Sequence, residues 1–250
     1  MLGFSRYPVS LDVQDWISDS AIWAMEHGLL TTHTPLILPT SQFFSAPKLG
    51  GPEDGQRVVA ALIDDFKRHL GCADDTIDCM PLDVLGAEYR YDPNALSGAA
   101  GTFQTDTVTS IIRYDPALLD QKLPLLSMIA HEMTHHILHK IPEPPFGDYE
   151  AEELSTDAQA IFMGCGVLQM AGAEVSGWQG YLSQPTRAHA LALFLLIRHI
   201  EPTAALNALP PRSAKYLKRA LKELSKQSEM IDRMHAALPD HQGTTAPVQS

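Results

Sequence analysis

A short H-E-x-x-H motif, from His131 to His135, holds the side chains of this chain that are best suited to chemistry. Residues four apart on an α-helix lie about 40° apart around its axis, so both imidazoles can reach one metal ion. Glu132 then projects beside that ion, where a carboxylate can take a proton from a metal-bound water molecule. The motif therefore predicts a zinc site with Glu132 as general base.

The third ligand of this site must come from elsewhere, because catalytic zinc normally takes three protein ligands. An acidic segment downstream supplies the candidates, namely Asp148, Glu150, Glu152, Glu153 and Asp157. Glu153 and Asp157 are four apart, so one can bind the metal while the other accepts a hydrogen bond from a ligating imidazole. We expect Glu153 to be the ligand. The alternative is that these acidic residues only begin a helix, where the macrodipole favours negative charge.

Three elements must position these residues. A mostly apolar helix should begin near Pro124 and bury most of its surface up to Ile137. A β-branched and aromatic segment at 107–114 predicts a strand that the following Asp-Pro pair ends. A second helix, at 151–170, should bring the acidic residues beside the first.

The spacing of the two motifs resembles that of the gluzincin zinc metallopeptidases, in which an E-x-x-x-D motif follows HExxH. Here Glu153 lies 18 residues after His135. The resemblance covers about residues 99–170. It implies one Zn²⁺ per chain held by His131, His135 and Glu153, Glu132 as general base, and Asp157 as the partner of His131. It also implies a peptide or protein substrate bound along the preceding strand region.

Gluzincins often place a further His or Tyr where it stabilises the oxyanion, and no motif identifies that residue here. The candidates are His136, Tyr149, Tyr181, His189, Arg198 and His199. His136 and His139 should lie on other faces of the helix than the two ligand histidines.

Composition indicates a soluble globular protein, with 45% hydrophobic and 19% charged residues among 250. We expect one domain over 1–238, with its motif core at about 99–170, and a disordered tail over 239–250. There is no signal-peptide pattern and no apolar run long enough to span a bilayer, so we expect a cytoplasmic protein without a membrane partner. Three cysteines without a pairing pattern fit reduced thiols.

The net charge of −12 argues against nucleic acid as a partner. Residues 212–233 are an exception, with seven of the eighteen basic residues and a local charge of +4. The favoured interpretation is an amphipathic helix with a solvated basic face, and the alternative is a membrane or RNA site. The helix could also dock against the acidic remainder of the chain.

The expected fold is α+β and zincin-like, a small mixed sheet packed on the HExxH helix with further helices at both termini. Those helices should lie at 11–29, 53–70 and 186–200, and further strands at 34–40, 76–85 and 98–104. We expect a zinc-dependent peptidase. The alternatives are a non-catalytic zinc-stabilised binding or regulatory protein, or a latent protease that needs activation. Cleavage specificity and oligomeric state have no signature in the sequence.

Overall fold

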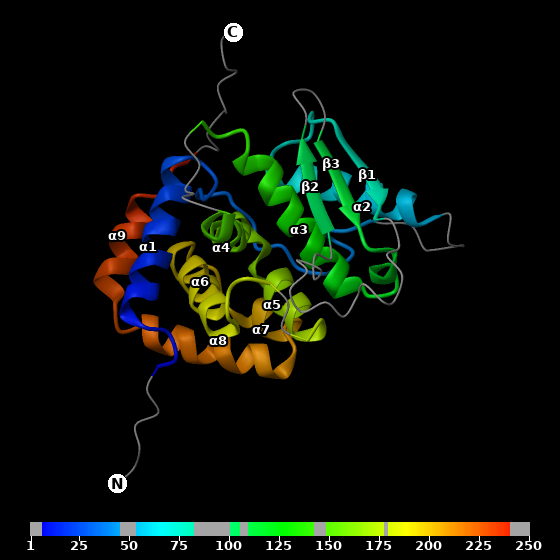
Figure 1. Ribbon diagram of the computed structural model, residues 1–250. Coiled ribbons are helices and arrows are strands. Elements are labelled where there is room, and N and C mark those ends of the chain that lie inside the picture. The colour runs from blue at the N-terminus through cyan, green and yellow to red at the C-terminus, as the bar shows by residue number, and fades with distance from the viewer. Residues whose placement is uncertain are drawn as a thin grey trace.

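The computed structural model of the chain describes residues 7–45, 54–82, 101–105, 110–142, 149–177 and 180–240 (Figure 1). Helices dominate the fold, and a small sheet accompanies them. The helices are α1 (Leu11–Glu26), α2 (Gly55–Leu70), α3 (Lys122–Leu138), α4 (Tyr149–Ala160), α5 (Gly166–Val175), α6 (Gln184–Ile197), α7 (Thr203–Ala208), α8 (Pro211–Leu224) and α9 (Ser228–Ala236). The strands are β1 (Ile77–Pro81), β2 (Gly101–Thr105) and β3 (Ser110–Tyr114). The expected mixture of helices and strands is therefore present.

The sheet is small and mixed, in the order β1-β3-β2. The central strand β3 runs parallel to β1 and antiparallel to β2, with Ile112 opposite Cys79 on one side and Phe103 on the other. Alternate residues of β3 are buried, as the two-residue period of a strand requires, so one face of the sheet is covered by helices. The strands predicted at 76–85, 98–104 and 107–114 are each found in part, and the remaining residues of those ranges lie largely outside the described residues.

Two helices cover the buried face of the sheet. In Figure 1 the HExxH helix α3 lies beside β2, and α2 lies behind β1. The two helices and the sheet share one hydrophobic cluster, whose most deeply buried members include Phe66, Ile112, Ile129 and Met133. The predicted packing of the sheet on the HExxH helix is therefore present.

The other half of the molecule is helical and centres on α6, which packs against α1, α5 and α8. Every residue of α6 from Ala188 to Leu195 is buried. Ser183 caps this helix by accepting a hydrogen bond from the backbone N–H of Thr186, and Pro185 occupies its first turn, where a missing N–H costs nothing. The helices predicted at 11–29 and 186–200 thus contribute to a second core, whereas the helix predicted at 53–70 packs on the sheet as α2.

The prediction of one continuous helix at 151–170 is wrong, because the helix is interrupted at Gly164. This residue has φ of +94°, and a Cβ there would lie 2.0 Å from the carbonyl oxygen of Pro35. The N–H of Ile37 donates to the carbonyl of Gly164 over 3.0 Å. The segment at 34–40, predicted as an edge strand, is therefore an irregular extended chain that crosses the helix at this glycine.

No helix in the described ranges is long and apolar enough to cross a membrane. Cys72, Cys79 and Cys165 are free thiols, as expected. Pro239 and Asp240, at the start of the predicted tail, contact Thr32 through hydrogen bonds of 2.9 and 3.2 Å. The rest of that tail lies outside the described residues, and the expected domain boundaries stay a prediction.

Candidate metal centre

Three side chains from two helices converge on one point. His131 and His135 are one turn apart on α3, and Glu153 reaches them from α4. The Nε2 atoms of the two histidines are 3.1 Å apart. Oε2 of Glu153 lies 3.0 Å from Nε2 of His131 and 3.4 Å from Nε2 of His135. Within the described parts of the chain, no other group of three His, Cys, Asp or Glu side chains has ligand atoms this close together.

The spacing of these three atoms fits a zinc ion. Zinc binds imidazole nitrogen and carboxylate oxygen at about 2.0–2.2 Å in a tetrahedron, which places neighbouring ligand atoms about 3.3 Å apart. The observed separations of 3.0, 3.1 and 3.4 Å bracket that value. Two nitrogens and one oxygen are also donors that zinc prefers. The three residues can therefore hold the metal without rearrangement of the two helices.

Asp157 fixes the orientation of His131. Its Oδ1 lies 3.0 Å from Nδ1 of that imidazole. A carboxylate only accepts hydrogen bonds, so Nδ1 carries the hydrogen and a neutral His131 presents its lone pair from Nε2 to the cage. The second oxygen of Asp157 accepts from the backbone N–H groups of Tyr181 and Leu182, at 2.9 and 3.0 Å. The carboxylate is thus held from both sides.

Arg187, which the sequence gave no reason to select, also holds Asp157. Its Nη2 donates to Asp157 Oδ2 over 2.9 Å, and both side chains are 2% exposed. Gly180 makes room for this pair, because a Cβ there would lie 2.0 Å from that Nη2 atom. Gly180 also has φ of +102°, a conformation that glycine adopts without strain. In the sequence, Arg187 is simply one polar residue in the first turns of a buried helix.

Two further residues of α4 face His135. Thr156 Oγ1 lies 3.4 Å and Glu152 Oε1 lies 3.6 Å from its Nδ1. From the sequence, Glu152 was one of the candidate ligands but was not selected. It was set aside because Thr156, four residues further on, is not a carboxylate, so the two do not make a pair like that of Glu153 and Asp157.

The protonation of the cage follows from its two carboxylates. Burial lowers the pKa of His131, but hydrogen bonds with Asp157 and Glu153 outweigh burial and raise it to about 10. Burial raises the pKa of Glu153, but its hydrogen bonds with His131 and His135 bring it down to about 2. The metal-free cage is thus an imidazolium held between two carboxylates, and a divalent cation would replace its proton.

Glu132 lies beside this cage and is 5% exposed. Burial raises its pKa above the usual range of a carboxyl group, and the charges of His131 and His135 offset part of that rise. A raised pKa is what a general base near neutral pH requires.

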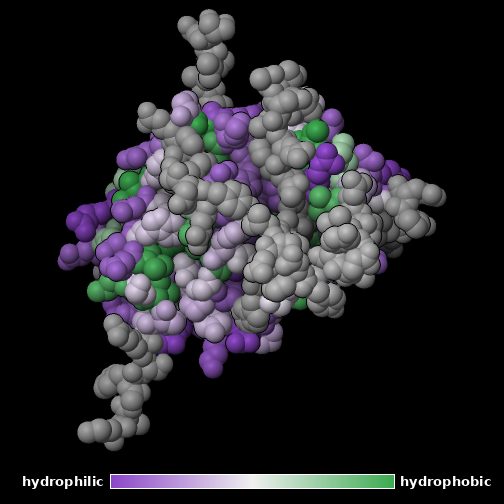
Figure 2. Space-filling view, viewed as in Figure 1, coloured by the Kyte–Doolittle hydropathy of each residue, from purple (hydrophilic) through white to green (hydrophobic). Residues whose placement is uncertain are grey.

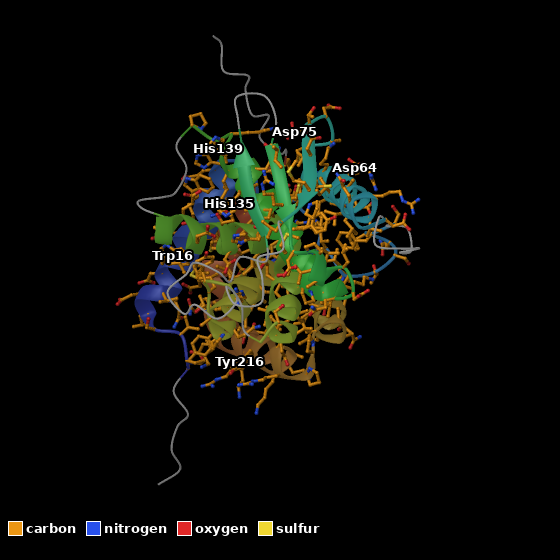
Figure 3. All side chains as sticks on the ribbon, turned by 45° about the vertical axis from the view of Figure 1, so that its right-hand side comes forward. Trp16, Asp64, Asp75, His135, His139 and Tyr216 are labelled. Atoms are coloured by element: carbon orange, nitrogen blue, oxygen red, sulfur yellow. The ribbon has the colours of Figure 1, made fainter. Side chains whose placement is uncertain are left out.

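Four of the six residues considered for an oxyanion contact have partners elsewhere. The pairs are His136 with Ser110 and Asp75, His189 with Tyr7, Arg198 with Thr34, and His199 with His235. Figure 3 shows Asp75 and His139 toward one end of the molecule and His135 nearer its middle. Tyr181 lies at the cage, with its ring nearly parallel to that of His131 at 6.2 Å and 46% exposed. The side chain of Tyr149 lies outside the described residues.

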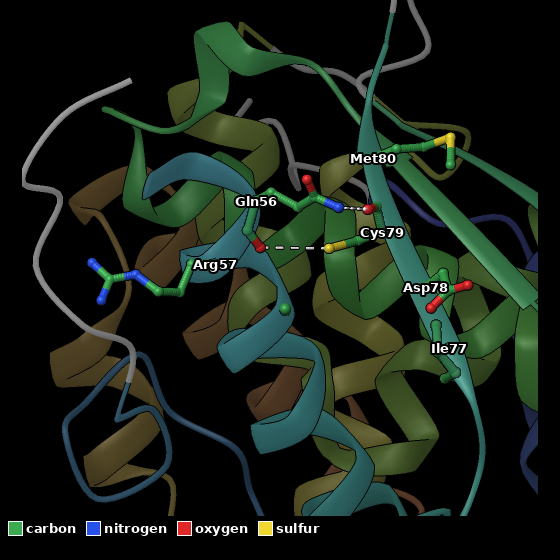
Figure 4. Close-up of a pocket in the computed structure, with 7 residues that line it drawn as sticks. Gln56, Arg57, Ile77, Asp78, Cys79 and Met80 are labelled. Carbon is green, nitrogen blue, oxygen red and sulfur yellow. Dashed lines mark hydrogen bonds between the residues drawn. The ribbon is translucent and has the colours of Figure 1, made fainter. Parts of the chain in front are cut away.

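A separate pocket of about 420 Å³ lies between α2 and β1 (Figure 4). Gln56 closes one side of it by donating to the carbonyl of Cys79 over 2.7 Å. Burial raises the pKa of the Cys79 thiol to about 11, so this sulfur is not a nucleophile at neutral pH. None of the described residues that line this pocket belongs to a group of three possible metal ligands.

Comparison with models of known protein families, with curated proteins and with solved structures finds no match to this chain. The chemistry of the site must therefore be argued from its own residues.

Proposed function

We propose that this protein is a zinc-dependent peptidase with a zincin-like arrangement of sheet and helices. The observation that carries the proposal is the convergence of His131, His135 and Glu153, with the buried Glu132 beside them on the same helix. A purely structural zinc site is usually closed by four protein ligands, whereas a catalytic one has three and leaves a position for water or substrate. Among the residues that the structure describes, the cage offers three.

Different residues of the site would have different roles in hydrolysis. Zinc held by the cage would polarise the scissile carbonyl and lower the pKa of a water molecule to about 7. Glu132 would accept a proton from the attacking water and pass it to the leaving amine. Asp157, held by Arg187, keeps His131 in the tautomer that presents Nε2 to the cage.

The strand β2 offers a place for an extended peptide substrate. It lies at the edge of the sheet, antiparallel to β3 and beside α3, and no other described strand pairs with its outer side. An extended peptide can add to such an edge through main-chain hydrogen bonds. This arrangement supports cleavage of a peptide or protein that runs past the HExxH helix.

The test compares three proteins loaded with one equivalent of zinc: wild type, Glu132→Gln and Glu152→Gln. Each is incubated with a mixture of peptides of varied sequence, and new termini are read by mass spectrometry. We expect wild type to cleave, Glu132→Gln to bind zinc normally and lose activity by at least about 10³-fold, and Glu152→Gln to retain activity within about tenfold.

Glu152 is compared because its side chain, 40% exposed, lies 3.6 Å from Nδ1 of His135. Glu152→Gln therefore measures the effect of removing a carboxylate beside a ligating histidine while the general base stays in place. Full cleavage by Glu132→Gln would overturn the mechanism. A zinc-loaded wild type that cleaves no peptide, even after trimming of its terminal segments, would favour a zinc-stabilised binding or regulatory protein.

A further inference from the structure

The exposed face of α8 carries a stripe of positive charge. Lys215, Lys218 and Lys222 follow each other at intervals of three and four residues, and all three are exposed. At about 100° per residue they lie within an arc of about 60° on the helix. None of them forms an ion pair with a described residue. In Figure 3, side chains that end in nitrogen extend outward below Tyr216, on the lower side of the molecule.

The exposed face of α1 carries the opposite charge with the same spacing. Asp12, Asp15 and Asp19 are all exposed, and they too follow at intervals of three and four residues. They also lie within an arc of about 60°. Both triplets therefore extend about 10 Å along their helices and cover the same arc around the helix axis.

Part of the charge on these helices is unfavourable for the helices themselves, although Asp12 in the first turn of α1 and Lys222 in the last turn of α8 suit the helix dipoles. Like charges three and four residues apart repel each other. Glu26 continues the acidic face into the last turn of α1, where the helix dipole disfavours a negative charge. Arg212 places a positive charge in the first turn of α8, where the dipole disfavours it. A surface of opposite charge would offset both penalties.

The outer face of α1 is also apolar at two positions. Leu11 is 74% and Ile22 is 40% exposed, and these are two of the four large hydrophobic side chains that are exposed among the described residues. In Figure 2, hydrophobic residues interrupt the hydrophilic surface over α1, whereas hydrophilic residues predominate along the lower margin, where α8 lies. The alkyl stems of lysine side chains can cover such apolar residues while their ammonium groups meet carboxylates.

We propose that α1 of one copy of this protein docks on α8 of a second copy, with the aspartate triplet against the lysine triplet. The N-terminal end of α1 lies near α8, because the guanidinium of Arg219 on α8 is 5.8 Å from the centre of the ring of Tyr7, just before α1. One contact face can therefore include both helices. Across a two-fold axis each copy supplies one acidic and one basic stripe, so the contact forms twice.

The test is sedimentation velocity of the full-length protein at about 10–300 µM and about 50 mM salt, where the Debye length exceeds 10 Å. We expect a dimer whose association constant falls by about tenfold or more at about 300 mM salt. Two charge-reversed proteins are compared with it, Lys218→Glu/Lys222→Glu and Asp15→Lys/Asp19→Lys. The control is Arg57→Glu/Arg233→Glu, which changes the net charge by the same amount as the first variant but lies outside both stripes.

Each reversed protein alone should be a monomer, because its α1 and α8 then carry like charge. An equimolar mixture of the two should restore the dimer, since every acidic stripe again meets a basic one, and the control should dimerise like wild type. Circular dichroism and zinc uptake should be unchanged in all of them.

A wild type that stays monomeric at about 300 µM and low salt would overturn the proposal. So would a mixture that fails to associate, or reversed proteins that dimerise normally. Binding of monomeric wild type to vesicles rich in phosphatidylserine, lost in Lys218→Glu/Lys222→Glu, would overturn it in favour of an anionic membrane as the partner of α8.

Discussion

Replacing Asp157 by asparagine should separate two roles of this carboxylate. Its Oδ1 orients His131, and its Oδ2 neutralises the buried Arg187. In the variant, the amide oxygen of the asparagine can still accept hydrogen bonds from the backbone N–H groups of Tyr181 and Leu182. The NH₂ group of the asparagine then faces Nδ1 of His131. That nitrogen must then accept a hydrogen bond, so a neutral His131 carries its proton on Nε2, the atom that faces the cage.

The expected losses follow from these contacts. Removing the hydrogen-bond partner of a ligating histidine costs about 10- to 100-fold in metal affinity, and the wrong tautomer places this variant near the upper end. That loss corresponds to about 2.7 kcal/mol. Leaving one partner of a buried ion pair without the other costs about 3–5 kcal/mol of folding stability, and Arg187 is 2% exposed.

The loss of zinc affinity and the loss of folding stability can be measured separately. Zinc affinity is obtained by competition with a chromogenic chelator, and the free energy of unfolding of the metal-free protein by urea denaturation. The double variant Asp157→Asn/Arg187→Met should recover stability to within about 2 kcal/mol of wild type, because it removes the unpaired cation. It should not recover zinc affinity.

The matched control is Asp75→Asn, which removes a carboxylate that lies 2.7 Å from His136 on the same helix, outside the cage. It should lower stability and leave zinc affinity within about threefold of wild type. Equal zinc affinity in wild type and Asp157→Asn, or equal losses in Asp157→Asn and Asp75→Asn, would refute the assignment of Asp157.

Three further predictions concern the cage and the backbone. Below its pKa of about 10, His131 is protonated in the metal-free protein, so zinc must displace one proton when it binds. The apparent affinity for zinc should therefore rise about tenfold per pH unit between pH 6 and 8. A chelator titration that shows no such slope contradicts the protonated cage. Gly180→Ala should push Arg187 off Asp157 and destabilise the fold by about 2–4 kcal/mol in urea, and an unchanged midpoint would count against the close fit. Gly164→Ala should cost at least about 2 kcal/mol by the same assay, because its Cβ meets the Pro35 carbonyl.

Most of the candidate site could be predicted from local spacing, because its residues lie one turn apart on two helices. His131 and His135 share a face of α3, and Glu153 and Asp157 share a face of α4. A four-residue interval places both members of each pair on one helix face. That the two faces meet was implied by the ligand number of zinc and by the gluzincin resemblance. The buried helix α3 and the strand β3 were likewise indicated by continuous patterns of apolar residues.

The features that sequence reasoning missed depend on contacts between distant segments. Arg187 meets Asp157 only because the turn at Gly180 brings α6 back to α4. The break at Gly164 arises because the segment around Pro35 crosses there, more than a hundred residues earlier in the chain. Neither contact leaves a periodic pattern, and a glycine inside a helical pattern fits either close packing or a break in the helix.

The most direct test of the account is the zinc content of protein purified without added metal or chelator, measured by elemental mass spectrometry. We predict about one zinc per chain in wild type and in the Asp75→Asn control, and less than about one tenth of that in Glu153→Ala. An absence of zinc from wild type that persists after zinc is added, or full zinc content in Glu153→Ala, would contradict the three-ligand site.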